Sequence, residues 1–182
     1  MAKLTSWSSD KIVGVSAMGI SFITLLIFLY QTNLMRKQNH LSILPYVAIS
    51  ISDDPANATY RLSLMNHGVG PAIIDQVVIK YKGEVIDLAQ YDHVTLRFLQ
   101  ERRRSLDSLK SFSYATLEKG MAIPANTTYT ILEAKQSAKD YALLKEALES
   151  IIAEGLYFEI YYSSIQQEHW RISNASQGPE KL

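Results

Sequence analysis

The chain has no cysteine among its 182 residues, and it contains only eight glycines and five prolines. Without cysteine there is no disulfide, no thiolate metal site and no thiol nucleophile, so disulfide-stapled secreted modules are excluded. An excess of either charge is also missing, because 18 basic residues balance 18 acidic ones. A near-neutral protein has no broad field to attract nucleic acid, so we expect no general nucleic-acid binding.

One long stretch lacks charge altogether. The nineteen residues from Ile12 to Tyr30 would form about 28 Å of helix, close to the ~30 Å hydrocarbon core of a bilayer. A secretory signal has a shorter apolar core and small residues before its cleavage site, whereas bulky Leu29 and Tyr30 stand here. We therefore predict an uncleaved, single-pass transmembrane helix over 12–33, with the lipid bilayer as a partner.

The orientation of this helix is weakly encoded. Lys3 and Lys11 precede the apolar stretch and Arg36 and Lys37 follow it, so the positive-inside rule hardly discriminates. No acidic residue follows the stretch until Asp53, and this favours a cytosolic carboxyl-terminal domain.

After Pro45 the pattern changes to short, β-branched and alternating segments separated by turn residues. In the segment 59–65, Tyr60, Leu62 and Leu64 alternate and should share one face of a strand. Further strands are predicted over 46–51, 72–81, 84–88, 111–117, 128–134, 156–165 and 169–173. The fold predicted from these strands is mainly β, an immunoglobulin-like antiparallel β-sandwich with two helical insertions.

The two insertions have different signals. Residues 92–110 alternate like a strand at first, but Leu99, Leu106 and Leu109 fit a helix, which we prefer. The second helix has Ser137 as N-cap, with Gly155 just past its end. The predicted order is an amino-terminal tail (1–11), the transmembrane helix (12–33), a linker (34–44), the β-sandwich domain (45–173) and a frayed tail (174–182).

No familiar catalytic or metal-binding pattern is present. The histidines at 40, 67, 93 and 169 lie outside any H-x-x-x-H or H-E-x-x-H pattern, and no G-x-S-x-G elbow occurs. We therefore expect no enzymatic activity, no catalytic residue, no metal and no cofactor.

Two other patterns suggest binding. Arg102, Arg103 and Arg104 form the densest run of charge, which indicates either an anion site or a solvated helix face. In the apolar stretch, small or polar side chains recur at three- or four-residue spacing and form a stripe that would let helices associate or line a narrow pore. The members of this stripe are Gly14, Ala17, Ser21, Thr24 and Gln31. The alternative is an anchor that contains them by composition alone.

The loop Asn66-His67-Gly68-Val69-Gly70-Pro71 raises the question of a phosphate-binding turn. Such a turn precedes a helix, whereas β-branched residues follow this one, so we predict a structural turn between strands. Gly68 and Gly70 are expected to supply positive φ angles, and Pro71 to begin a strand without an N–H. Asn66 should cap the turn and His67 should point to solvent.

The loop is also part of a resemblance. Leu41, Ser42 and Pro45 form an L-S-x-x-P pattern, Asn66 to Ala72 form N-x-G-x-G-P-A, and a Y-x-S-x-x-x-x-x-W-like hairpin closes the chain. In these motifs the chain resembles a family of small bacterial membrane proteins with one amino-terminal span and a β-sandwich. The resemblance implies that fold and a bacterial inner membrane location, but no activity. Leu44 stands where the family often has arginine.

The layout is similar, in architecture alone, to membrane effectors of bacterial anti-phage systems. By this analogy the spans self-associate into a homo-oligomer, and the cytosolic sandwich gates a channel or membrane-disrupting effector. The signal would be an anionic or nucleotide ligand, or a partner protein. The alternative is an adaptor whose sandwich recruits a partner protein through exposed sheet edges, the span being only a tether.

Overall fold

The computed structural model describes residues 8–87 and 94–182. The chain divides into two compact units, Met1–Ser42 and Ile43–Leu182. The described part of the first unit is one long helix, and the second unit is a β-rich domain with short helices.

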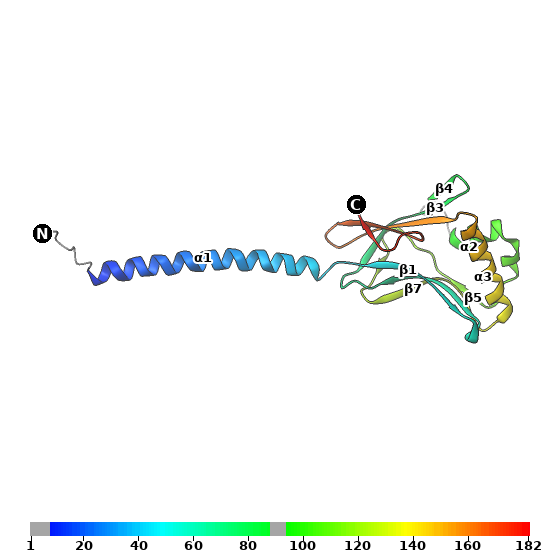
Figure 1. Ribbon diagram of the computed structural model, residues 1–182, viewed down its shortest axis with the longest axis horizontal. Helices are drawn as coiled ribbons and strands as arrows, with labels where there is room; N and C mark the ends of the chain where they lie inside the picture. Colours follow the sequence, from blue (N-terminus) through cyan, green and yellow to red (C-terminus); the bar gives the residue numbers. More distant parts are fainter. Residues whose placement is uncertain (1–7, 88–93) are drawn as a thin grey trace. The chain divides into compact units, whose positions relative to one another are not determined.

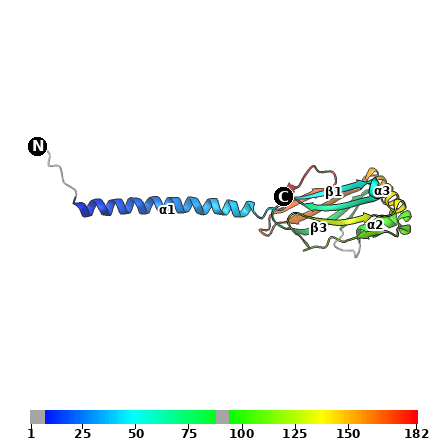
Figure 2. The ribbon, with the colours of Figure 1, turned by 90° about the horizontal axis from the view of Figure 1, so that it is seen from below.

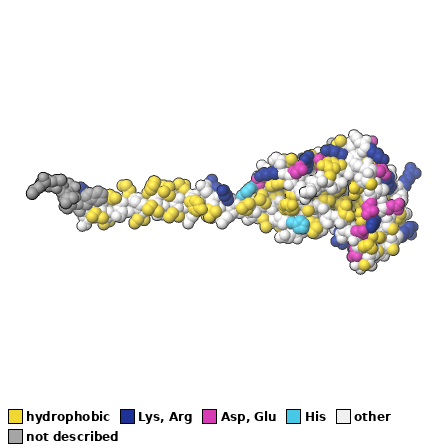
Figure 3. Space-filling model, in the orientation of Figure 1, with side chains coloured by type: hydrophobic (Ala, Val, Ile, Leu, Met, Phe, Trp, Pro, Cys, Tyr) yellow, Lys and Arg dark blue, Asp and Glu magenta, His cyan; other side chains and the backbone are white. Residues whose placement is uncertain are grey.

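Helix α1 (Ser9–Leu41) has 33 residues and is long and apolar enough to cross a membrane, with a mean hydropathy of 2.4 over its most apolar window. None of its side chains is buried against the described chain, and Figure 3 shows apolar side chains along most of its length. The helix continues to Leu41, so the prediction of a linker over 34–44 is wrong for most of that segment. Leu, Met, Arg, Lys and Gln in this segment favour helix, and no proline intervenes before Pro45.

Two antiparallel sheets form the β-rich domain (Figure 1). The first has the strand order β1-β2-β7-β5, and the second has the order β10-β9-β8-β3-β4, with β6 paired to β3. The strands are β1 (Val47–Asp54), β2 (Thr59–Asn66), β3 (Ala72–Tyr81), β4 (Glu84–Asp87), β5 (Phe112–Tyr114), β6 (Ala122–Ile123), β7 (Thr127–Ala134), β8 (Tyr157–Ser163), β9 (His169–Ser173) and β10 (Glu180–Lys181). Most predicted strands are confirmed with shifted ends, whereas the one predicted over 111–117 is reduced to three residues.

Both sheets lie in one unit (Figure 2) and contribute side chains to a single hydrophobic core. Tyr60, Leu62 and Leu64 are buried on one face of β2, as their alternation predicts. Ile160 and Tyr162 on β8 are fully buried in the same core from the second sheet. One shared core explains why the two sheets form one unit.

Helix α3 (Ala138–Ala153) adds a third apolar surface to this core through Leu144, Leu148 and Ile151. The predicted N-cap is confirmed, because Ser137 Oγ accepts a hydrogen bond from the Asp140 N–H at 3.2 Å. Gly155 follows the helix with a φ of 96°, a conformation in which glycine avoids the strain of a Cβ.

The predicted helix over 92–110 is two shorter helices, α2 (Val94–Arg102) and the 3₁₀ helix η3 (Arg104–Ser108). Arg103 separates them with a non-helical backbone, at φ −137° and ψ 86°. This break lets Leu106 and Leu109 both reach the core. The predicted start at Asp92, and with it His93, lies outside the described residues. A further 3₁₀ turn, η1 (Pro55–Asn57), connects β1 to β2.

The tail 174–182 was expected to be frayed, and that prediction is wrong. Glu180 and Lys181 form β10 and pair with Arg171 and Trp170 of β9. Complementary charge holds the strand, because Glu180 lies 2.5 Å from the Arg171 guanidinium. A two-residue strand leaves too little pattern in the sequence to be recognised.

Candidate functional site

The first residue of the arginine run is engaged at the end of α2. The Arg102 guanidinium lies 3.0 Å from a carboxylate oxygen of Glu84 and 3.1 Å from one of Glu101. Its centre is also 4.3 Å from the middle of the Phe98 ring, a cation–π distance. Arg102 therefore joins α2 to β4.

Glu154 engages the second residue of the run. Its carboxylate pairs with Arg103, accepts a hydrogen bond from the Tyr81 hydroxyl at 2.5 Å and lies 2.8 Å from Lys82 Nζ. Hydrogen bonds from Lys82 and Tyr81, followed by the one from Arg103, lower the pKa of Glu154 from 4.5 to about 2. These contacts fasten the end of α3 to the β3–β4 turn and to the break between α2 and η3.

Arg104 differs from its neighbours. It is exposed, and its side chain makes no hydrogen bond or ion pair with a residue that the structure describes. Arg102 and Arg103 are therefore each paired with different carboxylates, and Arg104 with none that the structure describes. Their role in binding an anion stays a prediction.

The hydroxyl groups in the polar stripe of α1 donate hydrogen bonds to backbone carbonyls of the same helix. Ser21 donates to the Ala17 carbonyl and Thr24 to the Ile20 carbonyl, each at 2.8 Å. At 100° per residue, the stripe from Gly14 to Gln31 covers an arc of roughly 100° on one side of the helix. Because the hydroxyls are satisfied internally, neither a pore nor a partner helix is required for them. Self-association through Gly14, Ala17, Ser21, Thr24 and Gln31 stays a prediction.

Asn66 is the polar centre of the β2–β3 turn and is 1% exposed. Its Oδ1 accepts hydrogen bonds from the N–H of Gly68 at 3.0 Å and of Tyr46 at 3.1 Å. Its Nδ2 lies within hydrogen-bond distance of the carbonyls of Gly70 at 2.9 Å and Ile123 at 3.1 Å. The predicted capping role is thus confirmed and extended, since one side chain joins three segments. His67 is exposed, as predicted.

The two glycines of this turn are required for a different reason from the one predicted. Neither Gly68 nor Gly70 has a positive φ. A Cβ on Gly68 would lie 2.4 Å from Leu44 O, and one on Gly70 would lie 1.9 Å from Ile43 O. The backbone of 43–46 therefore passes directly against the turn, and only glycine leaves room for it. The motifs L-S-x-x-P and N-x-G-x-G-P-A meet at this contact.

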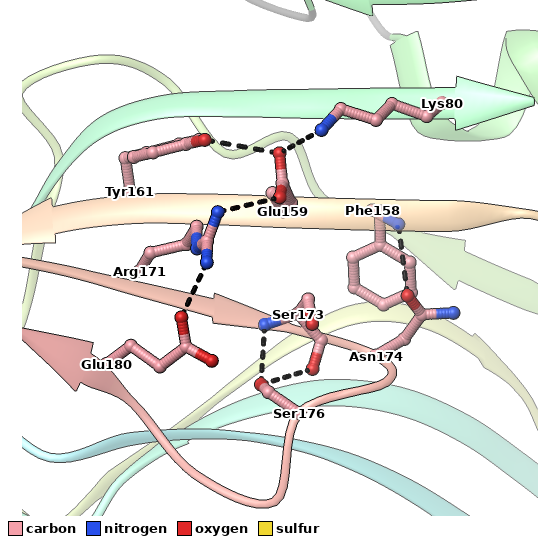
Figure 4. Close-up of polar contacts among 9 residues, drawn as sticks. All are labelled: Lys80, Phe158, Glu159, Tyr161, Arg171, Ser173, Asn174, Ser176 and Glu180. Atoms are coloured by element: carbon pink, nitrogen blue, oxygen red, sulfur yellow. Dashed lines mark hydrogen bonds and ion pairs between the residues drawn. The ribbon is translucent and has the colours of Figure 1, made fainter. Parts of the chain in front are cut away.

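A buried carboxylate lies on the second sheet (Figure 4). Glu159 is 2% exposed, and its oxygens lie 2.9 Å from Lys80 Nζ and 3.4 Å from the Arg171 guanidinium, with a hydrogen bond from Tyr161 at 3.2 Å. Burial by itself raises the pKa of Glu159, but these partners outweigh it and leave the pKa lowered. Arg171 extends the network to Glu180 of β10, so these charges bind the tail strand to the sheet.

The described histidines and carboxylates do not assemble a metal centre, since no group of three or more such side chains among them could hold an ion. A serine, an aspartate and a histidine meet at Asp75, which lies 3.0 Å from His169 Nδ1 and accepts a hydrogen bond from the Ser163 hydroxyl at 3.0 Å. Aspartate is the shared member here, whereas nucleophile activation needs the histidine next to the serine.

The outer side of β1 is the remaining candidate. The His67 N–H donates to the Tyr46 carbonyl at 2.8 Å, and β1 pairs with β2 in an unbroken register from Val47 to Asp54. In an antiparallel ladder the hydrogen-bonding residues alternate, so the main-chain groups of residues 48, 50, 52 and 54 face β2. Those of Val47, Ile49, Ile51 and Asp53 face away from it.

The contact of Val47 confirms this alternation, because its N–H donates away from β2, to the Tyr162 hydroxyl at 3.3 Å. No described residue pairs with the outward N–H and C=O groups of Ile49, Ile51 and Asp53. The sequence predicts exposed sheet edges in general. No residue pattern in it identifies β1 as an edge strand.

No protein-family model matches the chain, and no curated protein matches it in sequence. The resemblance to small bacterial membrane proteins, and the architectural likeness to anti-phage effectors, stay predictions.

Proposed function

We propose that this protein is a membrane-tethered recognition module. Helix α1 spans a bacterial inner membrane, and the cytosolic β-rich domain recruits a partner protein. The observation that carries the proposal is the open outer side of β1, where unpaired main-chain donors and acceptors form a ready template for another extended chain. This is the adaptor function, and it makes α1 an anchor.

The strand order supports an immunoglobulin-like sandwich for the recruiting domain. In that fold, strands A, B, E and D form one sheet and strands C, F and G the other. Here β1-β2-β7-β5 corresponds to A-B-E-D, and β9-β8-β3-β4 corresponds to G-F-C with an added edge strand. The α2–η3 pair and α3 then occupy the connections into strands D and F. Sandwiches of this kind commonly present edges and loops to partners, although the fold alone does not determine the function.

A crosslinking experiment with a span swap tests the recruitment. A photo-crosslinking amino acid replaces Ser52, which is exposed on β1, in the full-length protein in its native membrane. The same replacement at Val85, which is 68% exposed on β4, is the matched control. We expect a partner adduct from the Ser52 position alone, unchanged when residues 12–30 are exchanged for an unrelated apolar helix. Loss of the adduct in the swapped protein, or equal adducts at both positions, contradicts the proposal.

A second candidate is the membrane effector, in which α1 helices associate and the domain gates them. The stripe from Gly14 to Gln31 favours it, because small side chains allow close helix packing in lipid. It predicts that strong expression depolarises the host membrane and that Gly14→Leu with Ser21→Leu prevents this. Ile23→Leu, on the opposite side of the helix, is the matched control. A membrane potential that stays intact during expression of the unaltered chain contradicts the effector.

A further inference from the structure

The four strands at the ends of the two strand orders, β1, β5, β10 and β4, are protected to different degrees. Three of them are short, with three residues in β5, four in β4 and two in β10. β1 has eight residues and contains no proline, glycine or charged residue before Asp53. Natural sheets usually blunt their edges with short strands, lysine, proline or bulges, and β1 has none of these over 47–52. An unprotected edge of this length indicates that another strand pairs with β1.

A groove runs beside β1, between the margins of the two sheets. Its volume is about 240 Å³, and it is bounded by Tyr46, Ile49 and Ile51 on one side and by Ile172 of β9 on the other. Polar side chains of the following turn, including Asn174 and Gln177, complete its rim. Ile51 is 44% exposed although it lies among apolar neighbours. The open hydrogen-bonding groups of β1 are therefore adjacent to a groove with apolar walls and a polar rim.

We infer that an extended segment of a partner protein adds to the first sheet as a fifth strand beside β1. Its main chain bonds to the outward groups of Ile49, Ile51 and Asp53. Since side chains alternate along a strand, every second side chain of the segment enters the groove between Ile51 and Ile172. This inference rests on the proposed function, because it names the surface and the partner chemistry of the recruitment.

The chemistry of β1 defines the segment. Alternating donors and acceptors at 49, 51 and 53 are matched by another extended backbone, and a helix would leave them unsatisfied. The isoleucines at 49, 51 and 172 would contact apolar side chains of the segment, and the polar rim at 173–177 would contact polar ones. Charge contributes little, because the acidic group of Asp53 is already paired with Lys145 at 2.5 Å and with the Tyr141 hydroxyl at 2.6 Å.

The occupant is a strand of a different protein, because recruitment is the function proposed above. A second copy of the chain is the alternative occupant, and a dependence of protection on protein concentration would identify it.

Amide hydrogen exchange on the isotopically labelled, full-length protein in detergent tests the inference. The probe is an eight-residue peptide of alternating valine and threonine, N-methylated at every second residue so that only one of its edges can form hydrogen bonds. In the free protein we expect the amides of Ile49, Ile51 and Asp53 to exchange faster than those of Ala48 and Ser50. At a peptide concentration on the order of 1 mM, exchange at the three outward amides should slow about tenfold.

Matched reagents distinguish main-chain hydrogen bonding from nonspecific binding of the peptide. The same peptide N-methylated at every residue should give no protection. Ile51→Pro removes an outward donor without touching the β2 ladder and should weaken binding about tenfold, the loss expected for one hydrogen bond and its contacts. Ile51→Lys serves if the proline variant fails to fold, and Val85→Lys on β4 should bind like the unaltered chain.

Three results overturn the inference. The outward amides could be protected without peptide at all protein concentrations, which means that the chain itself covers the edge. Protection could rise with protein concentration, which identifies a second copy as the occupant. Exchange could also stay fast in the presence of the peptide. If any of these occurs while the Ser52 crosslink persists, recruitment stands, and the partner contacts the side chains of β1 and not its hydrogen-bonding edge.

Discussion

Replacing Gly68 with alanine adds one methyl group where the backbone of 43–46 passes against the β2–β3 turn. The new Cβ would lie 2.4 Å from both Leu44 O and Tyr46 N, whereas ordinary contact begins near 3.4 Å, so the segments must separate by 1.0 Å. Four hydrogen bonds cross this contact, three between backbone groups and one from the Tyr46 N–H to Asn66 Oδ1, with lengths from 2.8 to 3.2 Å. A shift of this size would lengthen all four beyond hydrogen-bonding distance.

At about 0.5–1.5 kcal/mol for each bond, the free energy of unfolding should fall by about 2–6 kcal/mol. The matched control is Gly83→Ala, because Gly83 has a φ of 87° and open space around it. Its cost is about 1–2 kcal/mol of backbone strain. Comparing the two variants therefore distinguishes steric crowding at Gly68 from backbone conformation as the reason that glycine is needed there.

Trp170 reports on this unfolding, since it is 8% exposed and stacks on Tyr162 with ring centres 5.8 Å apart. The measurement is urea unfolding followed by Trp170 fluorescence, in mild detergent and with Trp7→Phe as background. If Gly68→Ala proves no less stable than Gly83→Ala, the close approach does not determine the residue at position 68.

Three further perturbations test the described contacts. Asn66→Asp keeps the oxygen acceptor but places a carboxylate against the carbonyls that Nδ2 contacts, so it should cost at least about 2 kcal/mol in urea unfolding. The pKa of Glu154 is lowered to about 2, so the stability it contributes is complete above about pH 4.5 and is lost as the pH falls toward 2. Glu154→Gln should therefore be less stable than the unaltered chain at pH 7, with a difference that shrinks below pH 4.5. Arg103→Met should lower stability by up to about 1 kcal/mol, whereas Arg104→Met should leave it unchanged, both measured by thermal unfolding.

Each of these has a clear contrary result. Asn66→Asp that unfolds at the same urea concentration as the unaltered chain would mean that the Nδ2 contacts do not hold the turn. If the stability difference between Glu154→Gln and the unaltered chain stays constant from pH 7 to pH 3, the ion cluster around Glu154 is not its cause. Equal effects at Arg103 and Arg104 would contradict their different surroundings.

Features determined by neighbouring residues were predictable. The alternation of Tyr60, Leu62 and Leu64 identifies a strand with one buried face, and Ser137 identifies the start of α3, because both signals lie within a few residues of the structure they produce. The apolar stretch of α1 is equally local. The polar residues that follow this stretch predict a linker, because polar segments are typical of irregular structure. The same residues favour helix, and the helix continues through them.

Features determined by distant residues were not predictable. The requirement for Gly68 arises from the backbone at 44–46, which no local pattern connects with the turn. Likewise Arg103 is matched by Glu154, 51 residues further along the chain, so the arginine run looked like a free charge cluster. The open side of β1 depends on the order of strands in the sheet, which follows from the fold as a whole.

The uninterrupted length of α1 determines how far its carboxyl-terminal end extends beyond the membrane. If the apolar part up to Tyr30 fills the hydrocarbon core, the eleven helical residues from Gln31 to Leu41 extend about 16 Å beyond it. The headgroup layer on one side is only about 5–8 Å thick, so Leu41 would stand in water above it. The point at which the domain is attached would then lie outside the headgroup layer. Deleting four residues from 31–41 would move that attachment point about 6 Å toward the lipid.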